Sequence, residues 1–322
     1  MKYFLVNFLK RTALIFTAIS AFCLSILILP SNPSISDGLL YGKFAKDSLL
    51  LNTSNNRLIF VGGSNLSFGL NSEMLKDSLK LNPINTAIHA SIGLEYMLEN
   101  TLQYIKEGDM IVIAPEYSHF ISTSIHGGKE MIITMAEVDK FKLFSKLSIE
   151  QFKFFLKESP HYCLNKLSPY SYLITRDKYG VYGKYSFNRY GDAIRHYNLP
   201  NKKIGVKSRP YSIEEFNARS IYILREFKDE CNKIGANVFI SYPAFHHTAS
   251  LGSGPLIEYV DSTLRVNDFY VISNPDDYIM EDSLFFNTYY HLNYAGVQMR
   301  TSKLISDLKK VLKPTNISAD GF

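Results

Sequence analysis

The chain has 322 residues, of which 46% are hydrophobic and 20% charged, so it can bury a sizeable core in one large domain or two small ones. Its formal net charge of +5 does not indicate a nucleic-acid-binding protein, because Lys2, Lys10 and Arg11 supply three of those charges. The other basic residues are interleaved with acidic ones, as on an ordinary solvated surface. Composition therefore excludes a basic nucleic-acid-binding module and favours a globular protein with an added membrane segment.

The amino terminus predicts a membrane anchor. Residues 12–29 are largely apolar, and no charged residue occurs between Arg11 and Asp37. As a helix this run is about 27 Å long, close to the roughly 30 Å of a bilayer core. The basic tail, 1–11, predicts a cytoplasmic amino terminus, with the rest of the chain outside the cytoplasmic membrane. A cleaved signal peptide is the alternative, but no clear Ala-x-Ala site follows, so we expect an uncleaved single-pass anchor over 12–30.

Beyond the anchor, residues 31–56 read as a polar stalk, and α/β alternation begins at residue 57. Period and residue type predict two helices alternating with three strands, of which the third is nearly all apolar, as in a covered parallel sheet. In chain order these elements are a strand at 58–61, a helix at 72–81, a strand at 84–88, a helix at 94–105 and a strand at 110–114.

The alternation stops after Pro115 and resumes near Ser212. A loop at 116–130, a helix at 136–157 and an aromatic-rich stretch without long periodicity, 158–211, together predict an inserted cap over about 116–211. Ser212 and Glu215 have the spacing of a helix capping box. The elements expected after it are a helix at 212–234, a strand at 237–241, a helix at 255–266, a strand at 269–272, a helix at 294–312 and a flexible tail at 314–322.

These elements predict one α/β domain over 57–313, a flavodoxin-like three-layer α/β/α sandwich with a parallel sheet. Ligands of such sheets bind outside the carboxyl ends of the strands. We expect Ser64, Glu116 and the loop 242–248 at that edge, within reach of His291.

Ser64 and His291 are the strongest candidates for catalytic chemistry. Ser64 follows the apolar strand and a Gly62-Gly63 turn, and His291 lies in a polar loop before the last helix. A serine hydroxyl needs a nearby base to act as a nucleophile, and a histidine supplies one. The alternatives are a serine that caps the following helix and a purely structural histidine.

Three segments together resemble the SGNH, or GDSL-like, hydrolase superfamily, and more closely its membrane-anchored members associated with bacterial cell-surface polysaccharides. The segments are Gly62-Gly63-Ser64-Asn65, Ile92-Gly93, and Tyr290-His291-Leu292-Asn293 with Gly296. The resemblance covers about residues 57–312. It implies Ser64 as nucleophile and His291 as base, with the Ser64 and Gly93 amides and Asn65 holding the oxyanion beside Gly63.

The chain departs from the family pattern in two places. The strand end Ala114-Pro115-Glu116 lacks the asparagine that usually helps to form the oxyanion hole. Asn287 stands nearest to the position of the usual aspartate, and an asparagine orients an imidazole without stabilising its positive charge. Either Asp276, Asp277 or Asp282 substitutes, or the site is a Ser–His dyad, or activity is weak or absent.

Other polar and cysteine residues give weaker indications of a functional site. His246-His247 reads as a rim loop, because neither structural nor catalytic zinc spacing surrounds it. Residues 188–192 with His196 form either a structural turn or a substrate contact in the cap. Cys163 and Cys231 could pair in an oxidising compartment, but two cysteines do not establish a disulfide, and unpaired thiols are favoured.

The resemblance and the departures from it imply two functions, and a purely structural anchored domain is a third interpretation. The first is a membrane-anchored serine esterase or O-acyltransferase that removes or transfers an acyl group, expected to be acetyl, on a surface glycan, with no metal or organic cofactor. The second is a non-catalytic protein of the same fold that binds a glycan or an assembly partner. Expected partners are therefore the lipid bilayer, through 12–30, and a glycan, with no nucleic acid.

Overall fold

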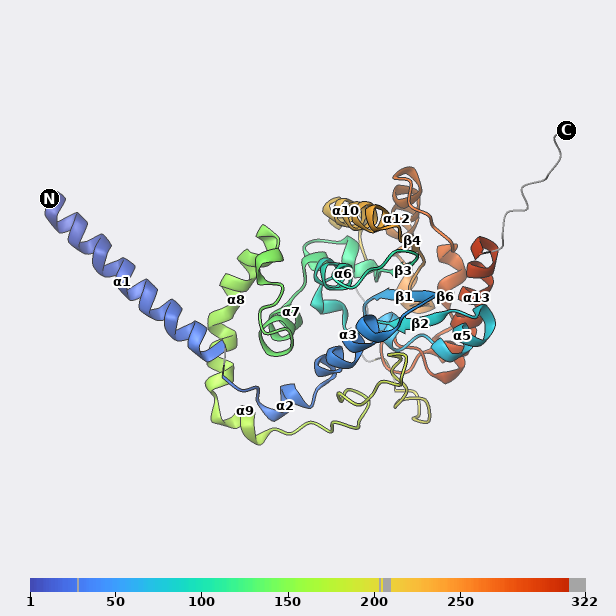
Figure 1. Cartoon of the computed structure of the whole chain (residues 1–322), viewed down its shortest axis with the longest axis horizontal. Coiled ribbons are helices and arrows are strands. Elements are labelled where there is room, and N and C mark those ends of the chain that lie inside the picture. The colour runs from blue at the N-terminus through green and yellow to red at the C-terminus, as the bar shows by residue number, and fades with distance from the viewer. Residues whose placement is uncertain (28, 203, 205–209, 313–322) are drawn as a thin grey trace.

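Four parallel strands form the central sheet, in the order β2-β1-β3-β4 (Figure 1). The structure is a computed structural model that describes residues 1–27, 29–202, 204 and 210–312. In register, Ile59 of β1 lies opposite Ile84 of β2 and Ile111 of β3. The strands of this sheet are β1 (Arg57–Gly62), β2 (Asn82–Asn85), β3 (Met110–Ala114) and β4 (Asn237–Ile240).

Helices cover both faces of the sheet, as a parallel sheet requires (Figure 1). The helices of the described residues are α1 (Lys2–Leu27), α2 (Pro33–Ser36), α3 (Lys43–Asn52), α4 (Ser64–Ser67), α5 (Ser72–Leu79), α6 (Leu94–Leu102), α7 (Lys129–Ile133), α8 (Ile149–Leu167), α9 (Pro169–Leu173), α10 (Arg219–Ile234), α11 (His247–Ser250), α12 (Gly254–Val266) and α13 (Tyr294–Leu312). A second, two-stranded sheet pairs β5 (Phe245–His246) with β6 (Ile279–Met280).

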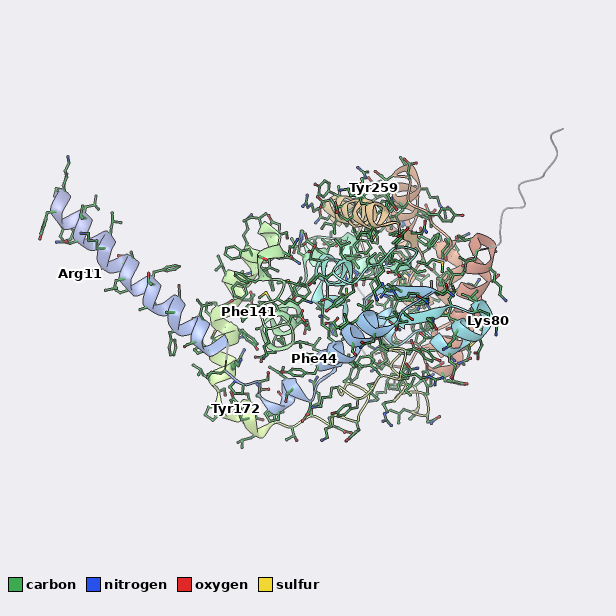
Figure 2. The ribbon with its side chains drawn as sticks, in the orientation of Figure 1. Arg11, Phe44, Lys80, Phe141, Tyr172 and Tyr259 are labelled. Atoms are coloured by element: carbon green, nitrogen blue, oxygen red, sulfur yellow. The ribbon has the colours of Figure 1, made fainter. Side chains whose placement is uncertain are left out.

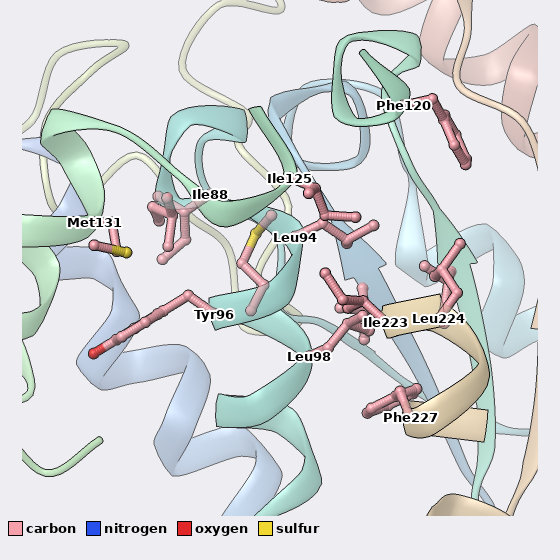
Figure 3. Packing of buried hydrophobic residues seen from close by; sticks show 14 of the residues in the cluster. Ile88, Leu94, Tyr96, Leu98, Phe120, Ile125, Met131, Ile223, Leu224 and Phe227 are labelled. Atoms are coloured by element: carbon pink, nitrogen blue, oxygen red, sulfur yellow. The ribbon is translucent and has the colours of Figure 1, made fainter. Parts of the chain in front are cut away.

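The core divides between the two faces because strand side chains alternate. Ile59 and Ile111 pack with α6, α10 and α12, and Figure 3 shows Leu98, Leu224 and their neighbours in this cluster. On the opposite face, Phe60 packs with α5 and α13. The predicted mixed α/β architecture with a parallel central sheet is therefore confirmed.

Element boundaries differ from the sequence prediction mainly where pairing is weak. The strand expected at 269–272 is a single bridge between Val271 and Ile240. The helix expected from residue 212 begins at Arg219, because Ile213–Glu215 forms a separate 3-10 turn. In that turn the Ser212 hydroxyl donates to Glu214, so the predicted capping box does not form.

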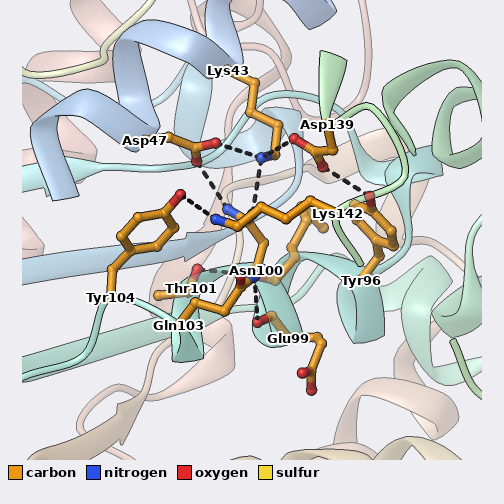
Figure 4. Close-up of polar contacts among 11 residues, drawn as sticks. Lys43, Asp47, Tyr96, Glu99, Asn100, Thr101, Gln103, Tyr104, Asp139 and Lys142 are labelled. Carbon is orange, nitrogen blue, oxygen red and sulfur yellow. Dashed lines mark hydrogen bonds and ion pairs between the residues drawn. The ribbon is translucent and has the colours of Figure 1, made fainter. Parts of the chain in front are cut away.

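Residues 31–56 do not form the expected polar stalk but fold onto the body. The Lys43 ammonium of α3 is buried and donates to Asp47, to Asn100 of α6 and to Asp139 (Figure 4). The Asp139 carboxylate also accepts from the Tyr96 hydroxyl at 2.8 Å. A fully paired buried charge fixes α3 in position, so the chain is anchored to the body before the first strand.

The described residues of the predicted cap, 116–211, form the long helix α8 together with short helices and turns (Figure 1). The single helix expected at 136–157 is replaced by a π-helical turn, Thr134–Val138, and by α8, which begins at Ile149. Asp192 is buried and accepts hydrogen bonds from Ser72 and Asn85, which shows a structural role for this residue of the segment 188–192. Asn188, Arg189 and Tyr190 line a surface pocket, so a substrate contact of these residues stays a prediction.

The amino-terminal helix α1 projects from the body (Figures 1 and 2). It is long and apolar enough to cross a membrane, and almost none of it is buried. The predicted tail, 314–322, lies outside the described residues.

Candidate active site

Ser64 lies where β1 ends at the carboxyl edge of the sheet. Strand β1 is buried along its whole length, and Ser64 begins the short helix α4 after Gly63. A side chain at Gly63 would place its Cβ 2.5 Å from Glu116 Oε1. Glycine is therefore required here because a carboxylate of the neighbouring strand approaches the turn.

Glu116 contacts Ser64 directly, and the sequence analysis did not anticipate this contact. It follows β3, next to β1 in the sheet, and its Oε1 accepts from the Ser64 hydroxyl at 3.2 Å and from the Asn65 amide at 3.0 Å. Burial raises the pKa of Glu116, and the hydrogen bonds from Asn65 and Ser64 offset only part of that effect. The signal was an acidic residue directly after the most apolar strand, where the family usually has its asparagine.

His291 is held by neighbours on three sides. Its ring stacks on Phe68 with 4.3 Å between centroids, and its backbone amide donates to the Thr288 hydroxyl. Its Nδ1 lies 3.1 Å from Asn287 Oδ1 and 3.4 Å from the Tyr182 hydroxyl. Because an amide oxygen only accepts, Nδ1 carries the proton and Nε2 has the free lone pair.

The environment keeps this imidazole neutral. Burial lowers the pKa of His291 to about 3, and the nearby His196 and His89 contribute in the same direction. At neutral pH His291 is therefore in the form that can accept a proton, although its low pKa makes it a weak base.

Asn287 takes the orienting position next to His291, as expected for a residue near the usual aspartate. It also donates to the Tyr182 hydroxyl at 2.6 Å, which fixes the direction of its amide. The nearby aspartates are engaged elsewhere: Asp282 pairs with His246 and Asp277 with Lys303. Within the described residues no aspartate contacts His291, so its only side-chain partners are neutral.

Ser64 and His291 line the same cavity, which has a volume of about 980 Å³. Its wall also includes His89, Glu130 and Tyr182. Among the described residues no hydrogen bond joins Ser64 to His291, and the Ser64 hydroxyl donates to Glu116. A catalytic role for Ser64 would require its hydroxyl to leave Glu116 first.

The residues expected to hold an oxyanion are already engaged. The Gly93 amide donates to the Ala90 carbonyl at 2.9 Å, and a Cβ at Gly93 would lie 2.4 Å from the Gly127 nitrogen. The Asn65 side chain is fully buried, donates to the Ala114 carbonyl and accepts from Arg300. Gly63, Asn65 and Gly93 therefore shape the turns around the site, and the expected donor role of Asn65 and Gly93 is not available in this conformation.

The other histidines do not form a metal site. His89, which the sequence analysis did not single out, accepts from the Ser91 amide at 3.1 Å, and burial lowers its pKa. His196 bonds to the Leu292 carbonyl behind His291. Among the described residues no group of three or more His, Cys, Asp or Glu side chains has the arrangement of a metal site.

Comparison with known proteins identifies no relative: no family model matches the chain, and no curated protein is significantly similar to it.

Proposed function

We propose that this protein is a membrane-anchored, SGNH-like serine esterase or O-acyltransferase that acts on an acyl group, acetyl being our expectation, of a cell-surface polysaccharide. One observation supports the catalytic part most directly. Ser64 and a neutral His291, whose Nε2 is free to accept, line one cavity at the carboxyl edge of a parallel sheet.

The proposed reaction has two steps, the formation of an acyl-serine at Ser64 and its breakdown. His291 Nε2 accepts the hydroxyl proton as Ser64 Oγ forms a bond to the acyl carbon, and the same proton then passes to the departing alkoxide. Water, or a sugar hydroxyl in the transferase case, gives its proton to Nε2 and attacks the acyl-serine, which releases Ser64 with its proton restored. Asn287 orients the ring throughout, because its amide oxygen accepts from Nδ1.

The membrane part of the proposal depends on α1. A basic tail, the apolar run and an absent cleavage motif favour an uncleaved anchor that leaves the globular domain on the outer side of the cytoplasmic membrane. The polysaccharide substrate and the flavodoxin-like, SGNH-type form of the sheet come from the motif resemblance.

A second function is favoured by the contacts around Ser64. The hydroxyl donates to Glu116, the Gly93 amide is occupied and Asn287 replaces an acid, all of which suit a non-catalytic glycan-binding or assembly protein.

The test is turnover of p-nitrophenyl acetate by the full chain in detergent micelles, with Ser64→Ala and His291→Ala. Ser171→Ala is the matched control, since Ser171 lines the same cavity and bonds only to the Ser168 carbonyl. We expect both site variants to lose turnover and the control to keep it. A fluorophosphonate should label Ser64 alone. Turnover equal in all four proteins, without labelling, would favour the binding function.

A further inference from the structure

Helices α8 and α9 carry an apolar face that no other described part of the chain covers. On α8 the exposed large apolar side chains recur at helical spacing and so lie on one side: Ile149, Phe152, Leu156, Leu164 and Leu167. Helix α9 and the residue after it continue the face with Tyr170, Tyr172, Leu173 and Ile174. Leu164 is 69% exposed and Leu173 78% exposed, although both are strongly apolar.

The exposure is not the result of a loosely attached helix. The other side of α8 is buried through Phe155 and Tyr162, and the Tyr162 hydroxyl donates to Glu137 of the π-helical turn. A buried ion pair between Lys166 and Glu137 adds a second attachment at 2.7 Å. The buried side of α8 is therefore attached to the body, and this attachment leaves the apolar face exposed.

The contact with α1 fixes where this face would lie. Cys163 of α8 donates to the Cys23 carbonyl at 3.4 Å, and Ile26 of α1 is buried in the core. Cys23 lies within the apolar run, four residues before α1 ends at Leu27, which is about 6 Å along a helix axis. In Figure 1, α8 lies along the edge of the body from which α1 projects, and Figure 2 shows Tyr172 beyond the carboxyl-terminal end of α1.

From this geometry we propose that α8 and α9 lie in the surface of the bilayer that α1 crosses, with their apolar face among the lipid chains. The distance of about 6 Å between Cys23 and the end of α1 fits this position, because interfacial helices bury their apolar side about 5–10 Å into the boundary between headgroups and acyl chains. Tyr170 and Tyr172 suit the headgroup level, where tyrosines are enriched. The exposed Lys153 lies within the apolar stripe and Lys157 at its edge, and their long side chains can extend towards the headgroups.

The proposed docking has a consequence for the cavity. Tyr170, Ser171 and Ile174 line the same cavity as Ser64 and His291. A docked α9 would therefore bring one wall of this cavity to the lipid surface. The docking proposal rests on membrane insertion of α1 and not on catalysis.

Single tryptophans test the proposal cleanly, because the chain contains no tryptophan. Leu164→Trp and Leu173→Trp report the apolar face in the full chain, reconstituted in phosphatidylcholine–phosphatidylglycerol vesicles with and without brominated acyl chains. Phe16→Trp reports insertion of α1, and Val266→Trp, 81% exposed at the end of α12, reports the body. Matched thermal unfolding curves establish that each variant is folded.

We expect brominated lipid to quench Leu164→Trp, Leu173→Trp and Phe16→Trp at least about twofold, as for rings in the acyl region, and to leave Val266→Trp unchanged. Quenching of Phe16→Trp without quenching at 164 and 173 would overturn the docking while keeping the anchor. No quenching at Phe16→Trp would refute the anchor itself. Blue-shifted but unquenched emission at 164 and 173 would mean that a second copy covers the face, which also overturns the proposal.

Discussion

Replacing Glu116 by glutamine tests whether the contact with Ser64 restrains the nucleophile. The carboxylate accepts from the Ser64 hydroxyl, which must leave it before it can reach His291. Glutamine keeps an oxygen acceptor of the same shape and removes the charge. We expect Glu116→Gln to increase acyl turnover at pH values above the raised pKa of Glu116, where the wild-type side chain is charged.

The magnitude follows from the kind of hydrogen bond that is changed. A bond to a charged acceptor contributes about 1.5–3 kcal/mol and a neutral one about 0.5–1.5, so the substitution weakens the restraint by about 1–1.5 kcal/mol. A barrier lower by that amount corresponds to a rate increase of roughly tenfold. Removing a negative charge next to the Ser64 amide also favours the developing oxyanion.

The pH dependence gives an independent signature. Burial raises the pKa of Glu116 above its ordinary value of 4.5, and His291 is neutral above a pKa of about 3. Wild-type turnover should therefore rise as pH increases through about 3 and decline as Glu116 ionises, whereas Glu116→Gln should lack the decline. Because the folded pKa is raised, the stability contributed by protonated Glu116 is present below 4.5 and is lost as pH rises through the folded pKa. Glu116→Gln should thus unfold at a higher temperature than wild type only at the higher pH.

The assay is p-nitrophenyl acetate turnover across pH by the full chain, together with thermal unfolding at the two ends of the range. Glu130→Gln is the matched control, since Glu130 lines the same cavity without contacting Ser64. Turnover as low as in Ser64→Ala would refute the reasoning and make Glu116 the base. Turnover equal to wild type at every pH would show that the hydroxyl is not restrained.

Three further substitutions test the candidate site and two ion pairs elsewhere in the fold. Asn287→Asp should increase turnover about tenfold or more, because a carboxylate at Nδ1 stabilises the His291 imidazolium. The same substitution should move the acid limb of the pH–rate profile upward from about 3. An unchanged acid limb would contradict this role of residue 287. Arg57→Met should lower the free energy of unfolding by about 3–5 kcal/mol in denaturant titrations, because it leaves Asp109 buried without its partner. Arg189→Met removes an exposed ion pair and should lower the free energy of unfolding by less than about 1 kcal/mol. Equal losses in Arg57→Met and Arg189→Met would refute the expected difference between a buried and an exposed ion pair.

Local pattern was sufficient where an element has a strong apolar signal. The nearly all-apolar strand at 110–114 and the helix at 294–312 have the boundaries that the sequence predicted. Boundaries failed at 212–218 and 269–272, where pairing with distant segments decides whether a short run becomes regular structure. The segment 31–56 was misjudged for a related reason, since Lys43 is polar in sequence yet is buried against two partners that lie far along the chain, Asn100 and Asp139.

In the candidate site, too, the sequence predicted the residues that have a local signal and missed the contacts between distant segments. Ser64, His291 and Asn287 were found from sequence because each has a local signal: a glycine turn after a strand, or a polar loop before a helix. The contact between Ser64 and Glu116 was not found, because it joins the ends of two strands that are neighbours only in the folded sheet. The engagement of the Gly93 amide and the Asn65 side chain likewise depends on how the turns close.

The sequence by itself determined the long apolar segment near the amino terminus, the alternating helices and strands and the two polar residues of the candidate pair Ser64 and His291, because hydrophobic periodicity and turn chemistry act over a few neighbouring residues. The tertiary structure decided that Ser64 and His291 share one cavity, that a buried carboxylate holds the hydroxyl, and that α8 and α9 present an apolar face beside α1. These features depend on contacts between segments that are distant in the chain, and burial sets both the neutral state of His291 and the raised pKa of Glu116.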